Sequence, residues 1–275
     1  MKLDAHQHFW SYNEAEYPWI PLGSPLQRDW LPKDFAVVQR PLGFDGSIAV
    51  QARQSLAETH WLLGLADADP RIFGVVGWVD LQAEDIAAQL ETLAGHPRLV
   101  GVRHVIQDEP DADFMRRPTF LRGLAQLQRF RLTYDLLIYP HQLPAALAVV
   151  RQFPEQRFVL DHGAKPLIRA GTLSPWREQI RELAAFQNVS CKVSGLVTEA
   201  DLTHWKPTDL RPYLEILAEA FDVRRLLFGS DWPVCLLAAE YEAVEGVVRD
   251  FFRGLDPQDQ ARLWGGNCAQ IYLNR

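Results

Sequence analysis

The sequence has few of the features that mark several large classes of protein. It contains three cysteines, Cys191, Cys235 and Cys268, and none of them forms a Cys-x-x-Cys pair. An odd number of widely spaced thiols argues against a disulfide framework and against a thiolate zinc site, so we predict free, buried cysteines. No apolar run approaches the roughly 20 residues needed to cross a bilayer, which argues against insertion into a membrane.

Basic residues are also scarce. The 28 Lys and Arg residues are outnumbered by 35 Asp and Glu residues, for a net charge of −7, and no basic cluster occurs. Nucleic-acid binding needs such a cluster, so we predict no nucleic-acid partner. The first residues lack the basic stretch, apolar core and cleavage site of a secretory signal, which predicts a cytoplasmic location. The composition neither requires nor excludes an oligomer.

Two catalytic motifs are missing. No strand is followed by the Gly-x-Gly-x-x-Gly turn of dinucleotide-binding sheets. The stretch Gly229-Ser230-Asp231 lacks the second glycine of a Gly-x-Ser-x-Gly nucleophile elbow. The first absence argues against an open doubly wound sheet, and the second argues against a serine hydrolase.

The chain instead shows a regular alternation of strand-like and helix-like segments. Strands alternating with helices pair in parallel through right-handed crossovers, and eight such units in 275 residues predict a single-domain (β/α)8 barrel over residues 1–275. An open doubly wound sheet is the alternative. A proline- and tryptophan-rich stretch, about 11–40, predicts a long structured loop after the first strand. The other predicted strands cover 43–51, 73–79, 99–106, 133–139, 157–162, 188–194 and 225–230, and the predicted helices 55–68, 85–93, 118–130, 144–153, 175–186, 210–221 and 238–252.

The first predicted strand carries two histidines two residues apart. Because side chains alternate along a strand, Asp4, His6 and His8 are expected to share one face. Two imidazoles in this arrangement converge on a single divalent ion or on one substrate group. Two histidines that merely end a strand are the structural alternative.

Most of the other predicted strands also end in polar residues. In a (β/α)8 barrel the active site lies at the carboxyl ends of the strands. Burying so many ionisable groups there is costly unless they pair with one another or bind a ligand. We therefore interpret the set as functional: Gln51, Arg53, Arg103, His104, Asp135, Tyr139, Asp161, His162, Lys192, Ser194 and Asp231.

Some of these residues compete for the same position. Asp161 and His162 are consecutive, so on a regular strand only one points inward, and the apolar pattern favours His162. Arg103 and His104 compete in the same way, and an outer salt bridge is an alternative for either. A helix N-cap is the structural alternative for Asp231.

Four segments stand out together: Asp4-Ala5-His6-Gln7-His8-Phe9-Trp10, Gly101-Val102-Arg103-His104, Asp161-His162-Gly163-Ala164-Lys165-Pro166 and Phe228-Gly229-Ser230-Asp231-Trp232-Pro233. They resemble the amidohydrolase superfamily, most closely its amidohydrolase-related branch with sugar-lactone hydrolases such as L-fuconolactonase-like and L-rhamnonolactonase-like enzymes. The match spans nearly the whole chain. The resemblance implies a (β/α)8 barrel and metal-assisted hydrolysis.

The expected reaction is the opening of a sugar lactone by water, as part of carbohydrate catabolism. We expect Asp231 to deprotonate the water, and His6, His8, His162 and Asp231 to hold one divalent ion, most simply Zn²⁺. No lysine in the fourth strand can bridge two metals, so we expect at most one ion. Without a metal, His162 and Arg103 would stabilise the oxyanion. Predicted substrate contacts are Arg53, Arg103, His104, Tyr139, Lys192 and Trp232.

Two other functions are compatible with the pattern. The first is hydrolysis or decarboxylation of an aromatic-derived dicarboxylate, or of its lactone, because many cationic groups surround the predicted pocket. The second is a catalytically silent binding protein that keeps the barrel. The joint presence of His6, His8, His162 and Asp231 argues against the second.

Overall fold

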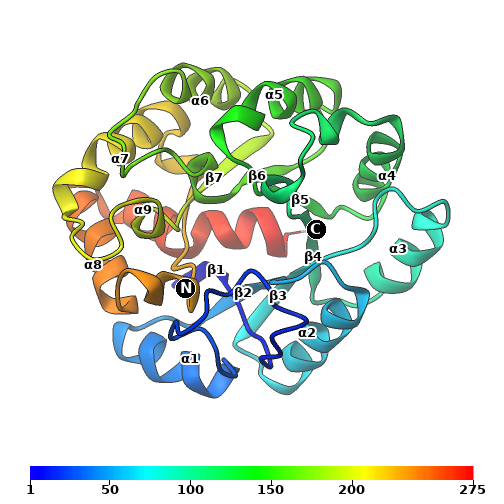
Figure 1. Cartoon of the computed structure of the whole chain (residues 1–275), viewed down its shortest axis with the longest axis horizontal. Helices are drawn as coiled ribbons and strands as arrows, with labels where there is room; N and C mark the ends of the chain where they lie inside the picture. The colour runs from blue at the N-terminus through cyan, green and yellow to red at the C-terminus, as the bar shows by residue number, and fades with distance from the viewer. Residues whose placement is uncertain (275) are drawn as a thin grey trace.

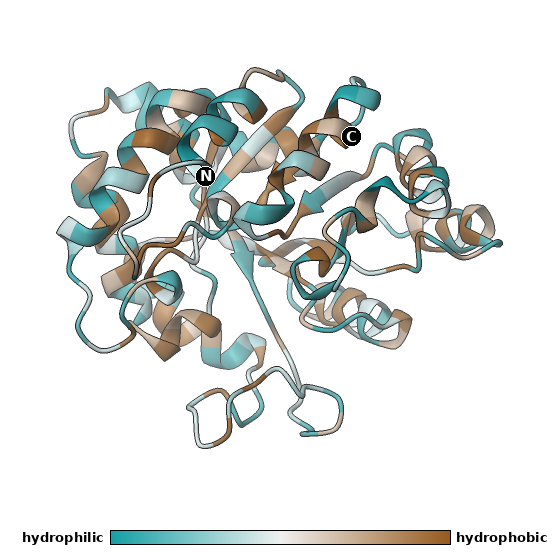
Figure 2. Cartoon of the chain, turned by 45° about the horizontal axis from the view of Figure 1, so that its top comes forward, coloured by the Kyte–Doolittle hydropathy of each residue, from teal (hydrophilic) through white to brown (hydrophobic). Residues whose placement is uncertain are grey.

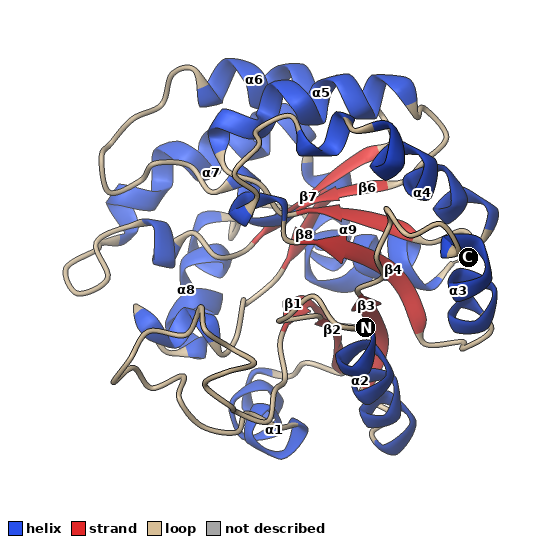
Figure 3. Cartoon of the chain, turned by 45° about the vertical axis from the view of Figure 1, so that its right-hand side comes forward, coloured by secondary structure: helices blue, strands red, loops and turns tan. Residues whose placement is uncertain are grey.

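The computed structural model describes residues 1–274 and contains eight parallel strands that follow one another around a barrel. Figure 3 shows the strands in red, with helices in blue outside them. The predicted (β/α)8 barrel is confirmed, and the open doubly wound sheet is not what forms. The strands are β1 (Leu3–Gln7), β2 (Gly46–Val50), β3 (Ile72–Gly77), β4 (Leu99–His104), β5 (Thr133–Leu136), β6 (Phe158–Leu160), β7 (Val189–Val193) and β8 (Leu226–Phe228).

The barrel closes where β1 meets the residues that follow β8. The amide of His8 donates to the carbonyl of Trp232 at 2.7 Å, and the amide of Asp231 donates to the carbonyl of His6 at 2.8 Å. These bonds continue the parallel ladder past the end of β8. They also hold Asp231 beside His6 and His8.

The helices surround the strands, as Figure 1 shows. Each predicted helix forms, with ends that differ by a few residues from the prediction. In Figure 2 the helices carry both teal and brown residues, as expected for elements with one face in the core. They are α1 (Pro32–Gln39), α2 (Leu56–Ala68), α3 (Ile86–Ala94), α4 (Pro118–Arg129), α5 (Leu143–Gln152), α6 (Trp176–Ala184), α7 (Pro207–Phe221), α8 (Tyr241–Phe251) and α9 (Pro257–Ala261).

Helix α1 lies inside the stretch predicted as a long loop. Pro32 occupies its first turn, where a missing amide hydrogen costs nothing, and the carboxylate of Asp34 accepts from the amide of Leu31 at 3.0 Å. The loop is therefore shorter than predicted and ends before α1. A two-way backbone pairing of Trp10 with Trp30 closes its base.

The C-terminal residues close the opposite end of the barrel. Figure 1 shows this red segment crossing the ring of strands. Cys268 and Tyr272 pack in the barrel interior against side chains such as Leu3 and Val159. Two helix-like turns, Arg262–Gly266 and Ala269–Leu273, flank Cys268, and the second carries Tyr272; neither was predicted from the sequence.

The three cysteines are buried and free, as predicted. Within residues 1–274 no helix combines the length and apolar character required to cross a bilayer.

Candidate active site

His6 in β1 and His8 directly after it face the barrel interior together, but Asp4 does not share their face. The carboxylate of Asp4 accepts from the hydroxyl of Tyr241 on α8, at 3.1 Å, outside the barrel. The pairing of β1 with β2 shifts register between Asp4 and Gln7, and this irregularity breaks the strict alternation that the sequence predicts. The expected common face is therefore right for His6 and His8 and wrong for Asp4.

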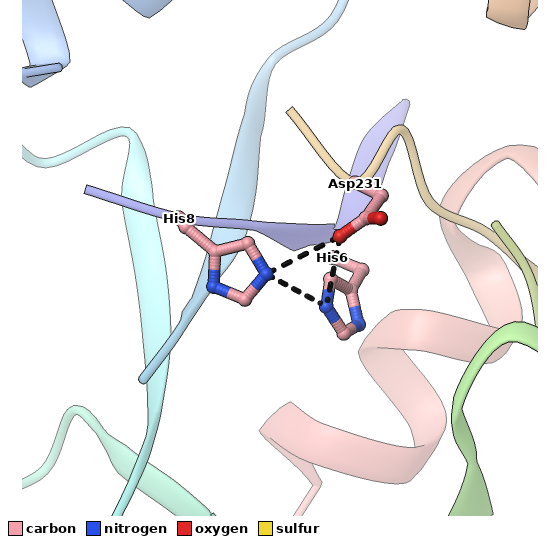
Figure 4. Close-up of side chains that lie close together, drawn as sticks. All are labelled: His6, His8 and Asp231. Atoms are coloured by element: carbon pink, nitrogen blue, oxygen red, sulfur yellow. Dashed lines mark hydrogen bonds and ion pairs between the residues drawn. The ribbon is translucent and has the colours of Figure 1, made fainter. Parts of the chain in front are cut away.

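His6, His8 and Asp231 converge on one point, as Figure 4 shows. The Nε2 atoms of His6 and His8 are 3.1 Å apart. Asp231 Oδ1 lies 3.3 Å from Nε2 of His8 and 3.6 Å from Nε2 of His6. Residues from the first strand and from the end of the last strand therefore meet at one edge of the barrel.

His162 reaches the same point from the turn after β6. Strand β6 ends at Leu160, and residues 162–165 all have positive φ, so Asp161 and His162 can both point inward. The expectation that only one of them does so is therefore wrong. His162 Nε2 is 3.8 Å from Asp231 Oδ1. A Cβ on Gly195 would lie 2.4 Å from Nδ1 of His162, so this position requires glycine.

Beneath the histidines lies a group of charged residues that we call the buried charge cluster: Arg103, Asp135, Asp161 and Lys192. Lys192 Nζ lies 2.6 Å from Asp135, 2.9 Å from Asp161 and 3.2 Å from Nδ1 of His6. Arg103 completes the cluster, 3.0 Å from Asp161. Two cations and two carboxylates balance, so the cluster carries no net charge while it orients the ring of His6.

Burial disfavours charged groups in this cluster, but the ion pairs determine the direction of the pKa shift for Lys192 and Asp161. Burial alone would lower the pKa of Lys192, yet Asp135 and Asp161 raise it. Burial would raise the pKa of Asp161, yet Lys192 and His6 hold it well below its usual range. The hydroxyl of Tyr272, from the C-terminal segment, donates to Asp135 at 2.7 Å. The closed end of the barrel is thereby connected to His6.

Three of these side chains, His6, His8 and Asp231, lie close enough together to hold one divalent ion. Ligands at about 2.0–2.2 Å from a tetrahedral zinc lie roughly 3.3–3.6 Å from one another, close to the separations of these three. His162 lies beside them, 3.8 Å from Asp231. Burial lowers the pKa of His6 well below its usual value and that of His162 to about 4, so both imidazoles are neutral. Nδ1 of His8 lies 2.8 Å from the carbonyl of Val50, to which it donates, and this leaves Nε2 as a ligand.

The predicted substrate-binding residues divide into two groups. Arg53, Arg103 and Tyr139 line a cavity of about 860 Å³ that also includes His8, His162 and Asp231 in its wall. This volume is ample for a small ligand. Arg53 pairs with Glu16 of the loop after β1 at 2.6 Å.

The remaining three predicted contacts lie away from the cavity. Lys192 is fully buried in the charge cluster, so a substrate cannot reach it. His104 points outward, 2.7 Å from Glu109 and stacked on Phe114, because its neighbour Arg103 takes the inward position. Trp232 packs against aromatic rings including Phe35 and Trp30. The positions of these three residues do not support the predicted substrate contact.

The cavity wall also contains residues that the sequence analysis did not select. Trp19 comes from the loop after β1, and Lys165 and Glu199 from the loops after β6 and β7. Lys165 Nζ lies 3.3 Å from Glu199. Burial raises the pKa of Glu199, against the effect of Lys165. No periodic pattern marks loop residues, although Lys165 belongs to the motif that contains His162.

Comparison with known proteins places the chain in a family. The family model described as amidohydrolase matches residues 3–273. The chain belongs to this amidohydrolase family. The predicted resemblance is therefore confirmed.

Several relatives are close. The chain is 43% identical to the L-fucono-1,5-lactonase of Burkholderia multivorans, over 99% of this chain and 96% of that protein. It is 36% identical to the L-fucono-1,5-lactonase of Burkholderia ambifaria, over 98% and 95% of the two chains. A crystal structure of an amidohydrolase from Burkholderia multivorans with bound zinc superposes with a TM-score of 0.95, at 41% identity, over 99% of both chains.

Proposed function

We propose that the protein is a lactonase that opens a six-carbon sugar lactone, of the type named for its relatives, to the corresponding acid. The observation that carries the proposal is the position of Asp231 in the cavity wall, beside the imidazoles of His6, His8 and His162. The names and near full-length coverage of the Burkholderia relatives support the same substrate class.

Asp231 is the proposed base. Its Oδ1 faces the imidazoles, whereas Oδ2 points away from them in Figure 4. Burial disfavours its charged form, but the adjacent His162 and His8 lower the pKa of Asp231 below its ordinary value, so it is ionised at neutral pH. A water between this carboxylate and the lactone carbonyl carbon would lose its proton to Asp231 as it attacks.

One divalent ion, most simply zinc, is the proposed cofactor. His6, His8, His162 and Asp231 would hold it, and it would supply a Lewis acid that polarises the lactone carbonyl. Arg53 and Tyr139 are the proposed contacts for the sugar hydroxyls, and Arg103 reaches the same wall. A cytoplasmic location and a role in sugar catabolism stay predictions from the sequence.

The charge of the cavity wall disfavours the dicarboxylate alternative. Each cation of the wall already faces a carboxylate: Arg53 faces Glu16, Arg103 faces Asp161, and Lys165 faces Glu199. A substrate with two carboxylates would meet a wall without excess positive charge, whereas a neutral sugar lactone needs no such excess. The carboxylates of the wall are Glu16, Asp108, Glu199 and Asp231, against the cations Arg53, Arg103 and Lys165.

The test is an assay of Asp231→Asn on a panel of aldonolactones that includes L-fucono-1,5-lactone. We expect the turnover rate to fall by about 10²–10⁴-fold, the usual contribution of a positioned base. Zinc content must be measured in parallel, because the substitution also changes a proposed ligand. A folded, zinc-loaded Asn variant that opens the lactone at close to the unmodified rate would contradict the role of Asp231.

A further inference from the structure

Opening a lactone requires a proton donor as well as a base, and this need rests on the function proposed above. When the carbonyl carbon expels the ring oxygen, that oxygen leaves as an alkoxide. The leaving alcohol is about as weak an acid as water, with a pKa of about 15.7, so unassisted departure is slow. A group that delivers a proton to this oxygen would therefore accelerate the bond cleavage.

Few cationic groups in the cavity wall can supply this proton. His8, His162 and Asp231 are the proposed metal ligands. Arg53 and Arg103 carry guanidinium groups, which do not release protons in proteins. Among the described residues of the wall, Lys165 is the remaining cation, and an ammonium is a donor with three protons.

The fold holds Lys165 in a defined position. Lys165 has φ of 48°, and its amide donates to the carbonyl of His162 at 2.9 Å, so the turn that presents His162 also presents Lys165. Its ammonium lies 3.3 Å from Glu199 and 5.4 Å from the centre of the Tyr139 ring. The side chains of Lys165 and Glu199 are only 16% and 17% exposed. A left-handed, non-glycine residue is energetically costly and is kept where surrounding structure fixes it.

We propose that Lys165 is the general acid of the reaction, and that Glu199 is a positioning residue that holds its ammonium group in the cavity. Water forms a bond to the carbonyl carbon and gives a proton to Asp231. The bond from this carbon to the ring oxygen breaks, and its electron pair takes a proton from Nζ of Lys165. The products are a carboxylic acid and a hydroxyl group. Asp231 then loses its proton and Lys165 regains one through solvent, which restores the enzyme.

The test varies the acidity of the leaving alcohol. The substrates are L-fucono-1,5-lactone and its analogue with a trifluoromethyl group in place of the C6 methyl, where the fluorines make the leaving alcohol more acidic. Lys165→Met removes the proton donor and keeps the length of the side chain. We expect Lys165→Met to lower turnover of the parent lactone by about 10²–10⁴-fold and turnover of the trifluoro analogue at least about tenfold less. An equal loss on both substrates would overturn the proposal.

A second variant separates proton donation from charge. Lys165→Arg keeps the positive charge but not the ability to donate, so we expect it to lose turnover of the parent lactone as Lys165→Met does. Recovery of the rate by Arg would overturn the proposal and leave an electrostatic role. Lys206→Met, an exposed lysine in the loop before α7, is the matched control and should keep the unmodified rate. If the unmodified protein opens neither lactone, the proposed function itself fails, an outcome distinct from equal losses in an active enzyme.

Discussion

The molecule uses the same types of charged side chain in two neighbouring regions with different exposure. In the buried charge cluster, Asp135, Asp161 and Lys192 have no exposed surface, and each contacts another charged member of the cluster. In the cavity wall the side chain of Arg53 is 23% exposed and that of its partner Glu16 is 47% exposed. These three residues of the cluster are closed to a ligand, whereas the wall, which Arg103 also reaches, is open to one.

This difference shows that burial, more than residue type, determines what a charged side chain can do here. Attraction between charges is strong in the dry interior but is offset by the cost of removing them from water, so the cluster depends on complete pairing. In the partly exposed pair of Arg53 with Glu16, water screens the charges, and a ligand can replace one partner at little cost. The cluster therefore orients His6, and the wall is available for recognition.

Among the substitutions that test this contrast, Lys192→Met should change the free energy of unfolding the most. The change leaves Asp135 and Asp161 buried without their shared cation, and such a loss typically costs about 3–5 kcal/mol. We expect the free energy of unfolding, measured by urea denaturation of the metal-free protein, to fall by this amount. Adding Asp135→Asn to the same protein removes one of the uncompensated charges and should recover part of the loss. A fall below about 1 kcal/mol would show that water reaches the cluster.

The fold was largely predictable from the sequence because it depends on local patterns. The strands are short apolar runs, and the amphipathic helices between them repeat every 3.6 residues, so both can be recognised without knowledge of their partners. Helix α1 was missed because its start depends on Pro32 and Asp34, not on an apolar period. The C-terminal turns were missed because Cys268 and Tyr272 face a barrel interior that exists only after folding.

The candidate site was predictable where a side chain simply follows the end of its strand. Asp231 and the pair His6 and His8 meet as their positions implied. The sequence could not show that four residues with positive φ let Asp161 and His162 both turn inward. Nor could it give the depth of Lys192, because a residue near a strand end can point into the interior below the cavity as well as into the cavity itself.

Tyr272→Phe should have an intermediate effect, because it removes one hydrogen bond to the cluster and no charge. The ring continues to fill the barrel end while Asp135 loses a donor at 2.7 Å, and a hydrogen bond to a charged group is worth about 1.5–3 kcal/mol. The matched control is Tyr213→Phe, whose hydroxyl contacts only neutral carbonyls at 3.3 Å and should cost about 0.5–1.5 kcal/mol. Equal losses of unfolding free energy in both variants would show that the charge of Asp135 adds nothing to this bond.

The smallest effect is expected in the wall, for Glu16→Gln. The pair of Glu16 with Arg53 is short, at 2.6 Å, but it is partly exposed, and pairs of this kind contribute about 0–1 kcal/mol. We therefore expect the free energy of unfolding to change by less than about 1 kcal/mol, and the difference from the unmodified protein to shrink further in about 1 M salt, where charges are screened within roughly 3 Å. Urea denaturation at low and high salt measures both quantities. A loss above about 2 kcal/mol that persists in high salt would mean that this pair is as dry as the cluster, and the contrast between the two regions would then fail.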